Sequence, residues 1–370
     1  MKKSTLFLLP FLYIVLNTPN CHSCTGITLK SEDGSFIFGR TLELAQDLNS
    51  DLIIVPRGYK YIGSTPEGKN GMQWSVKYGF VAMNASVEPT LAADGLNEKG
   101  LAVGIFYLPG YTKYETYNKD LESKTLAPIE FATWLLSNFA KVKDVKNGLG
   151  LSRVVNVAIK SWYFVPPLHF MVTDQTGASI VIEYIDGMIK VHNNPIGVIT
   201  NAPSFDWHIT NLSNYVNLSP LNKTSIKLGT LKIKPFGEGS GMLGLPGDFT
   251  PPSRFIRATI FSKNVLPGKN ATETVRQTFH VLNQFDIPKG IICSKNRKKT
   301  YDKTQWTSAS DTNNKQYYIH TINNRTIRKV DLKKADLNAK NIVTIPVNLV
   351  DEKIEDLTPI VKKINTPSDS

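Results

Sequence analysis

The stretch "NCHSCTGITLKSEDGSFIFGRTLEL", residues 20–44, holds two of the chain's three cysteines, Cys21 and Cys24, three positions apart. A C-x-x-C spacing is typical of a zinc or redox pair, so its surroundings decide how it should be interpreted. After Cys24, two runs with alternating apolar residues, "TGITLKS" and "SFIFGRTLEL", flank the turn-forming residues 32–34. The stretch therefore predicts a β-hairpin that begins at Cys24.

The first 23 residues differ in composition from the rest of the chain. Two lysines at positions 2–3 precede an apolar run over residues 6–16, and the polar stretch 17–23 ends in a small residue. This pattern is typical of a secretory signal peptide, although a buried N-terminal strand is an alternative. The run is too short to span a bilayer, which needs about 20 apolar residues. We expect a signal peptide over 1–23, a secreted or periplasmic protein, and no integral membrane segment.

Cleavage after Ser23 would divide the cysteine pair. Cys21 would be removed with the signal peptide, and Cys24 would become the first residue of the mature chain. Only Cys24 and Cys293 would then remain, far apart in sequence. One disulfide between them is possible, but we expect two free thiols, with Cys293 behaving as a small buried hydrophobe.

The composition is that of a globular protein, with 41% hydrophobic and 20% charged residues. A net charge of +12 could indicate a polyanionic partner, but the basic residues are dispersed along the chain, so we expect no nucleic acid partner. The histidines of the mature chain are isolated and lack the spacing of metal ligands, so we expect no metal and no cofactor.

Strands and helices follow one another in blocks. Hydrophobic periodicity and turn residues predict the following order: strands at 52–56, 79–86 and 100–108, helices over 127–148, strands over 154–200, helices at 205–216, 254–262 and 271–285, and final strands in "QWTSASD" and "QYYIHTI". This order predicts an α+β fold with more than one sheet, in a single domain over residues 24–370. The helices exclude a β-sandwich, and the many tight antiparallel turns exclude a doubly wound sheet.

An N-terminal cysteine can carry a base and a nucleophile on one residue. Its α-amine, with a pKa of about 7.7–8.0, can take the proton of a thiol whose pKa is about 8.5. N-terminal threonine hydrolases use a terminal amine in this way. Arg40, on the returning strand of the hairpin, could hold the thiolate, and Glu43 could hold the ammonium form of the terminus. A surface ion pair between Arg40 and Glu43 is the alternative.

Five sequence blocks, in this order, resemble the signature blocks of a known family: "CTGITL" with "FGRTLE", "DGLNEKGLAVGIFYLPG", "NPIGVITNAPSFDWH", "GLPGDFTPPSRFIRA" and "TQWTSASDTNNKQYYIHTINNRTIRKVDL". The family is that of the choloylglycine hydrolases, which includes bile salt hydrolases and penicillin V acylases. The resemblance covers residues 24–332. It implies a four-layer αββα N-terminal nucleophile hydrolase fold with two antiparallel sheets.

The resemblance also implies roles for particular residues. Cys24 matches the nucleophile, Arg40 the arginine beside it, Asn201 the asparagine of the oxyanion hole, and Arg254 the arginine that completes the polar site. Tyr107 stands where bile salt hydrolases usually have asparagine and penicillin V acylases often have tyrosine, which favours the Gram-negative penicillin V acylases. Glu43 replaces the usual aspartate.

Each of these residues also has a structural interpretation. Asn201 could be a plain turn residue, Tyr107 could pack in the core, and Arg254 could lie on a solvated face in the first turn of a helix.

The predicted function is hydrolysis of a linear, non-peptide amide C–N bond by the Cys24 thiol. The predicted partner is a small amide substrate with an apolar acyl group, of penicillin V or conjugated bile salt type. The resemblance further implies a homo-oligomer, a tetramer. Two alternatives remain at this point: an amidase acting on N-acyl-homoserine lactones or other N-acyl lipids, and a non-catalytic secreted binding protein with the same fold.

Overall fold

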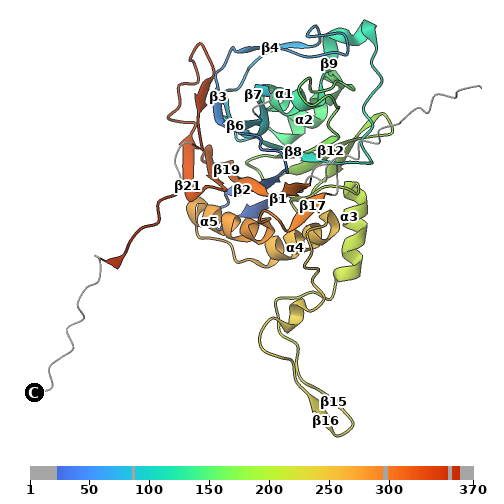
Figure 1. Ribbon diagram of the computed structural model, residues 1–370, viewed down its shortest axis with the longest axis vertical. Helices are drawn as coiled ribbons and strands as arrows, with labels where there is room; N and C mark the ends of the chain where they lie inside the picture. The colour runs from blue at the N-terminus through green and yellow to red at the C-terminus, as the bar shows by residue number, and fades with distance from the viewer. Residues whose placement is uncertain (1–22, 86–87, 295–298, 349–351, 359–370) are drawn as a thin grey trace, which may run out of the picture.

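In a computed structural model of the chain, two large antiparallel β-sheets stack face to face between two layers of helices (Figure 1). The structure describes residues 23–85, 88–294, 299–348 and 352–358. The predicted signal peptide lies outside these residues, apart from Ser23. The four layers confirm the predicted αββα arrangement.

The first sheet contains the hairpin predicted from the sequence. Strand β1 (Cys24–Lys30) pairs with β2 (Phe36–Glu43), so that Cys24 lies opposite Leu42 and Gly26 opposite Arg40. The sheet has the strand order β14-β1-β2-β19-β20-β21. Its other members are β14 (Val198–Ile199), β19 (Thr304–Asp311), β20 (Gln316–Thr321) and β21 (Asn324–Asp331).

The second sheet has eight strands, in the order β13-β12-β11-β8-β7-β6-β3-β22. Its members are β3 (Leu52–Val55), β6 (Phe80–Ala85), β7 (Glu88–Asn97), β8 (Ala102–Tyr107), β11 (Leu168–Thr173), β12 (Ser179–Ile185), β13 (Met188–Asn193) and β22 (Val343–Ile345). Two-stranded ribbons lie outside both sheets: β4 (Lys60–Ile62) with β5 (Gln73–Ser75), β9 (Thr125–Leu126) with β10 (Arg153–Val154), β15 (Ile226–Leu228) with β16 (Leu231–Ile233), and β17 (Ile292–Ser294) with β18 (Thr300–Asp302).

The helices form the two outer layers. Helix α1 (Phe131–Asn138) packs on the eight-stranded sheet, next to α2 (Val142–Gly148), and α4 (Pro251–Asn264) and α5 (Ala271–Leu282) pack on the six-stranded sheet (Figure 1). Helix α3 (Phe205–Asn211) follows β14. Short 3₁₀ segments occupy Lys119–Lys124, Pro128–Glu130, Leu149–Leu151, Leu212–Tyr215, Ser240–Met242 and Asn283–Phe285.

Alternation along the strands separates three layers of core. On β2, Phe38 points into the core between the two sheets, whereas its neighbour Ile37 packs with Phe279 of α5. Phe131 of α1 packs with Phe170 of β11 on the outer face of the second sheet. Because successive side chains of a strand point to opposite faces, a strand with apolar residues on both faces can be buried on both.

Two sequence predictions differ from the structure, and one ribbon was missed. The helical segment 127–148 is divided into α1 and α2, with Phe139 extended between them. Both described cysteines are free, as predicted, but Cys293 is exposed, because it lies on the β17–β18 ribbon and outside the sheets. The β15–β16 ribbon, which projects from the body of the protein (Figure 1), was not predicted.

Candidate active site

Cys24 is buried at the first position of β1, and its thiol contacts a guanidinium. The Sγ atom accepts a hydrogen bond from Nη2 of Arg40 at 3.0 Å. Arg40 is fully buried, donates from Nη1 to the carbonyl of Ile105 at 2.7 Å, and lies over the rings of Phe106 and Trp306. The hairpin register therefore brings Arg40 to the sulfur, as the sequence predicted, and the surface ion pair is excluded.

The main-chain nitrogen of Cys24 is held by a different residue from the one that contacts its sulfur. It donates to Oδ1 of Asn201 at 2.8 Å. In this chain it belongs to the Ser23–Cys24 peptide, and it stands where the α-amine would lie if the chain began at Cys24. Burial raises the pKa of the Cys24 thiol, and the charge of Arg40 opposes that rise. A buried thiol of this kind needs a base to become a nucleophile, and a free α-amine on the same residue could serve as that base.

Arg254 forms hydrogen bonds with both Cys24 and Asn201. It lies in the first turn of α4, which begins with two prolines, residues favoured at that position. Its Nη2 donates to Oδ1 of Asn201 at 2.6 Å, and its Nη1 donates to Oγ1 of Thr25 at 2.9 Å and to the carbonyl of Cys24. Arg254 is 1% exposed, so the interpretation of a solvated helix face is wrong.

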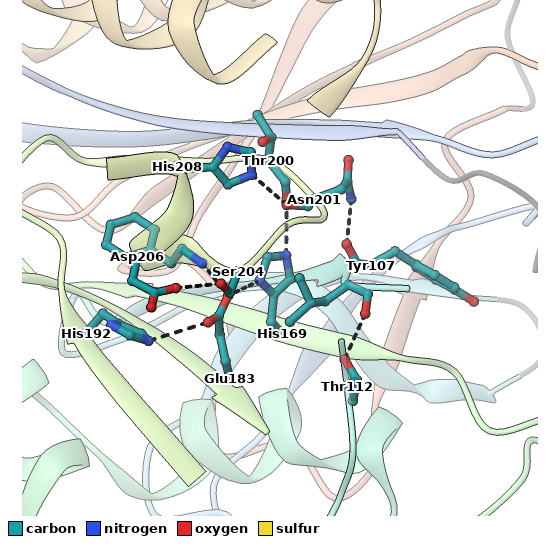
Figure 2. A network of polar contacts seen from close by, with 12 residues as sticks. Tyr107, Thr112, His169, Glu183, His192, Thr200, Asn201, Ser204, Asp206 and His208 are labelled. Carbon is teal, nitrogen blue, oxygen red and sulfur yellow. Dashed lines mark hydrogen bonds and ion pairs between the residues drawn. The ribbon is translucent and has the colours of Figure 1, made fainter. Parts of the chain in front are cut away.

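Asn201 follows β14 and uses both ends of its side-chain amide. The oxygen accepts from Cys24 and Arg254, and Nδ2 donates to the carbonyl of Tyr107 at 2.9 Å (Figure 2). The amide is thereby oriented with its nitrogen toward the end of β8. The side chain is 1% exposed and makes long-range contacts, so Asn201 is more than a turn residue.

Tyr107 reaches the site through its main chain. Its carbonyl accepts the hydrogen bond of Asn201, while its ring points away from that amide (Figure 2) and lines the cavity beside Cys24. Burial raises the pKa of the phenol, which stays protonated at neutral pH.

Glu43 ends β2 and is 2% exposed. Its Oε1 accepts from Oγ1 of Thr304 at 3.0 Å, and Oε2 has no hydrogen-bond partner among the residues that the structure describes. The Cys24 nitrogen donates to Asn201 rather than to Glu43, so the predicted contact with the terminus is not formed in this chain. Burial raises the pKa of Glu43 to about 7, against the opposing charge of Arg254.

Asp94 of β7 is a buried acid near Arg40 that the sequence analysis missed. It is fully buried, and its Oδ2 accepts from Oγ of Ser308 and from the hydroxyl of Tyr317. Burial raises the pKa of Asp94, and the nearby charge of Arg40 opposes that rise. The signal was an aspartate inside the apolar strand "LAADGLN", where an acid needs a partner.

A cavity opens beside Cys24. Apolar side chains make up most of its wall. They come from both sheets, the loop after β2, the 3₁₀ turn at Pro128–Glu130 and the loop before β11: Leu42, Leu44, Leu48, Ala85, Ala93, Ile105, Ile129, Trp162, Pro166 and Leu168. A lining of this kind suits an apolar group of a small molecule. The described residues contain no cluster of three potential metal ligands, and no helix among them is long and apolar enough to cross a bilayer.

Comparison with known proteins gives one family. The family model described as "Linear amide C-N hydrolases, choloylglycine hydrolase family" matches residues 24–345. The bile salt hydrolase/transferase of Clostridium perfringens is 35% identical over 88% of this chain and 97% of its own length. The penicillin V acylase of Pectobacterium atrosepticum is 26% identical over 90% of this chain and 87% of its own length.

Solved structures agree with the sequence comparison. A variant of the conjugated bile acid hydrolase from Clostridium perfringens superposes with a TM-score of 0.80 at 33% identity, covering 90% of this chain and 99% of that one. The penicillin V acylase of Agrobacterium tumefaciens has the same fold, with a TM-score of 0.71 at 23% identity, covering 89% of this chain and 94% of that one.

Proposed function

Because this chain belongs to the choloylglycine hydrolase family of linear amide C–N hydrolases, and is an amidase, we propose that Cys24 is its nucleophile and that its substrate is an amide with an apolar acyl group, of conjugated bile salt or penicillin V type. One observation carries the proposal: the Cys24 sulfur lies 3.0 Å from the Arg40 guanidinium and faces an apolar cavity. Of the other polar groups, Asn201 accepts from the nitrogen of the same cysteine, and Arg254 donates to its carbonyl and to Asn201.

The reaction uses the Cys24 amine as base and then as acid. The amine takes the thiol proton, and the sulfur attacks the acyl carbonyl, whose oxygen becomes negative and accepts a hydrogen bond from Nδ2 of Asn201. The C–N bond breaks as the protonated amine gives its proton to the leaving amine, which leaves a thioester on Cys24. Water, deprotonated by the same amine, attacks the thioester, and the C–S bond breaks to release the acid.

The choice between the two substrate types rests on Tyr107. Its ring lines the cavity beside Cys24, and a tyrosine here favours the phenoxyacetyl group of penicillin V. The identities with the two kinds of relative do not favour that branch, because the bile salt hydrolase is the more similar of the two. The preference for penicillin V therefore stays a prediction.

A panel of three substrates tests the proposed function. The mature enzyme should release the amine from penicillin V or from glycocholate at least about tenfold faster than from a long-chain N-acyl-homoserine lactone, measured as kcat/KM; this difference corresponds to about 1.4 kcal/mol of transition-state binding. A preference for the lactone would support the lipid amidase instead. No hydrolysis of any of the three would support a binding protein.

We also propose that the protein is secreted or periplasmic and assembles into a homo-oligomer, with the β15–β16 ribbon contacting a second copy. The composition of residues 1–23 supports export. Support for assembly comes from the ribbon, which extends away from the body (Figure 1) and exposes apolar side chains on both strands and just beyond them: Ile226, Leu228, Leu231, Ile233 and Phe236. Exposed clusters of this kind indicate a contact surface.

The assembly is tested by light scattering after size-exclusion chromatography. The wild-type protein should elute with the mass of an oligomer, and a variant with residues 225–234 replaced by a short Gly-Ser turn should elute as a smaller species. A wild-type protein that is monomeric at about 10 µM would contradict the proposal. An oligomer that survives removal of the ribbon would place the contact elsewhere.

A further inference from the structure

Two buried histidines hold the main chain on which Asn201 is carried. Nε2 of His169 lies 3.1 Å from the carbonyl oxygen of Thr200, and Nε2 of His208 lies 2.9 Å from the carbonyl oxygen of Asn201 (Figure 2). A carbonyl oxygen can only accept, so each of these ring nitrogens carries a proton. The peptide groups on both sides of the Asn201 side chain are thus fixed by imidazoles.

His169 is itself oriented by a buried carboxylate. Its Nδ1 lies 3.1 Å from Oε1 of Glu183 on the adjacent strand β12, and the same oxygen accepts from the main-chain nitrogen of Phe205 at 3.0 Å. Nε2 of His192 lies 3.4 Å from the other oxygen of Glu183. Burial disfavours the charge on Glu183, but the hydrogen bonds with His169 and His192 outweigh it and lower the pKa to about 2. Glu183 therefore stays charged and anchors His169.

His208 connects Asn201 to the helix that carries Arg254. It projects from α3, and its ring stacks on Phe255 of α4 with centroids 4.5 Å apart and planes 13° from parallel. Burial lowers the pKa of His208 to about 4, so its ring is neutral at working pH. The single proton of a neutral ring must then be on Nε2, because that nitrogen faces a carbonyl.

We propose that His169, with Glu183 behind it, and His208 are positioning residues that fix the side-chain amide of Asn201 for the oxyanion. They touch neither sulfur nor cavity, and they act through the carbonyls of residues 200 and 201. An oxyanion donor is effective only if it is already oriented when charge develops, and a displacement of about 1 Å can cost on the order of 100-fold in rate. The inference rests on the amidase function proposed above.

The test compares replacements of His208 that keep or remove its donor. In His208→Gln the side-chain Nε2 can still donate to the carbonyl of Asn201, whereas His208→Leu fills similar space without a donor. We expect His208→Leu to lower kcat about 30- to 100-fold with KM changed less than threefold, and His208→Gln to recover most of kcat. His169→Leu should behave like His208→Leu.

A matched control uses another buried histidine. His320 is 2% exposed and packs on Phe279, and neither of its ring nitrogens has a hydrogen-bond partner among the described residues. His320 lies on β20, four strands from β14, so His320→Leu makes the same substitution away from Asn201 and should leave kcat within about twofold. Equal losses of kcat in His320→Leu and His208→Leu, or full kcat in His208→Leu, would overturn the proposal.

Amide hydrogen exchange separates failure of this proposal from failure of the proposed function. Exchange over residues 198–204 should accelerate at least about tenfold in His208→Leu and His169→Leu, and it should return toward the wild-type rate in His208→Gln. This readout requires no substrate, so it holds even if the wild-type protein hydrolyses none of the three amides. Unchanged exchange in both Leu variants would overturn the proposal whatever the activity.

Discussion

Replacing Cys24 by alanine is expected to abolish amide hydrolysis, lowering kcat by on the order of 10⁴-fold or more while the protein stays folded. The sulfur forms the covalent bond to the acyl group, and a methyl group cannot do so. Removing Sγ also removes the acceptor of the Arg40 hydrogen bond, but Arg40 keeps its contact with the carbonyl of Ile105 and its two aromatic neighbours. We therefore expect the fold to tolerate the change. The measurement is the rate of amine release, with the thermal midpoint as the check on folding.

The other described cysteine supplies the control. Cys293 is free and exposed on the β17–β18 ribbon, so Cys293→Ala should leave kcat within about twofold. A Cys24→Ala enzyme that retained more than about a tenth of the wild-type kcat would show that the sulfur is not the nucleophile. Loss of activity in Cys293→Ala, with activity retained in Cys24→Ala, would show that hydrolysis depends on the β17–β18 ribbon instead of the Cys24 sulfur.

Keeping a single residue in front of Cys24 is the second change with a large expected effect. A chain that begins at Ser23 should lose at least about 10³-fold in kcat relative to one that begins at Cys24. The lone pair of a peptide nitrogen is delocalised into its carbonyl, so this nitrogen cannot take the thiol proton as an α-amine can. The contacts around it would persist, because the Cys24 nitrogen donates to Asn201 and the Ser23 carbonyl accepts from the main-chain nitrogen of Glu43 at 3.1 Å.

The two chains can be produced by cleavage of matched fusions, and mass spectrometry verifies each start. In a bacterial host, the full-length chain should also give an exported product whose N-terminal sequence begins at Cys24. A Ser23-started chain with the full rate would refute the role of the amine as base. An exported product that begins at another residue would refute both the cleavage after Ser23 and the mechanism.

Local patterns made much of the site predictable. Hairpin pairing is local in sequence, and the turn at residues 32–34 fixes which residues of the two strands face each other. That register is enough to bring Arg40 toward Cys24, as the structure confirms. The positions of Asn201, Tyr107 and Arg254 came instead from the family resemblance, and the structure brings all three close to Cys24.

The contacts and exposure of residues whose partners are distant in sequence were not predictable. Asp94 became interpretable only once β7 lay beside Ser308 and Tyr317, more than 200 positions away. The histidines looked isolated in sequence, yet folding places His169 and His192 on either side of Glu183. The exposure of Cys293 depends on its ribbon lying outside the sheets, which a short apolar run cannot reveal.

The sequence by itself determined the chemical groups of this protein and the hairpin that brings the Arg40 guanidinium beside the Cys24 thiol. Only the tertiary structure decided what those groups can do. Asn201 and Arg254 approach Cys24 from 177 and 230 positions away, and burial raises the pKa of the Cys24 thiol and of Glu43. The physical reason is that desolvation and long-range hydrogen bonds depend on how the layers pack, whereas residue identity and strand register are set along the chain.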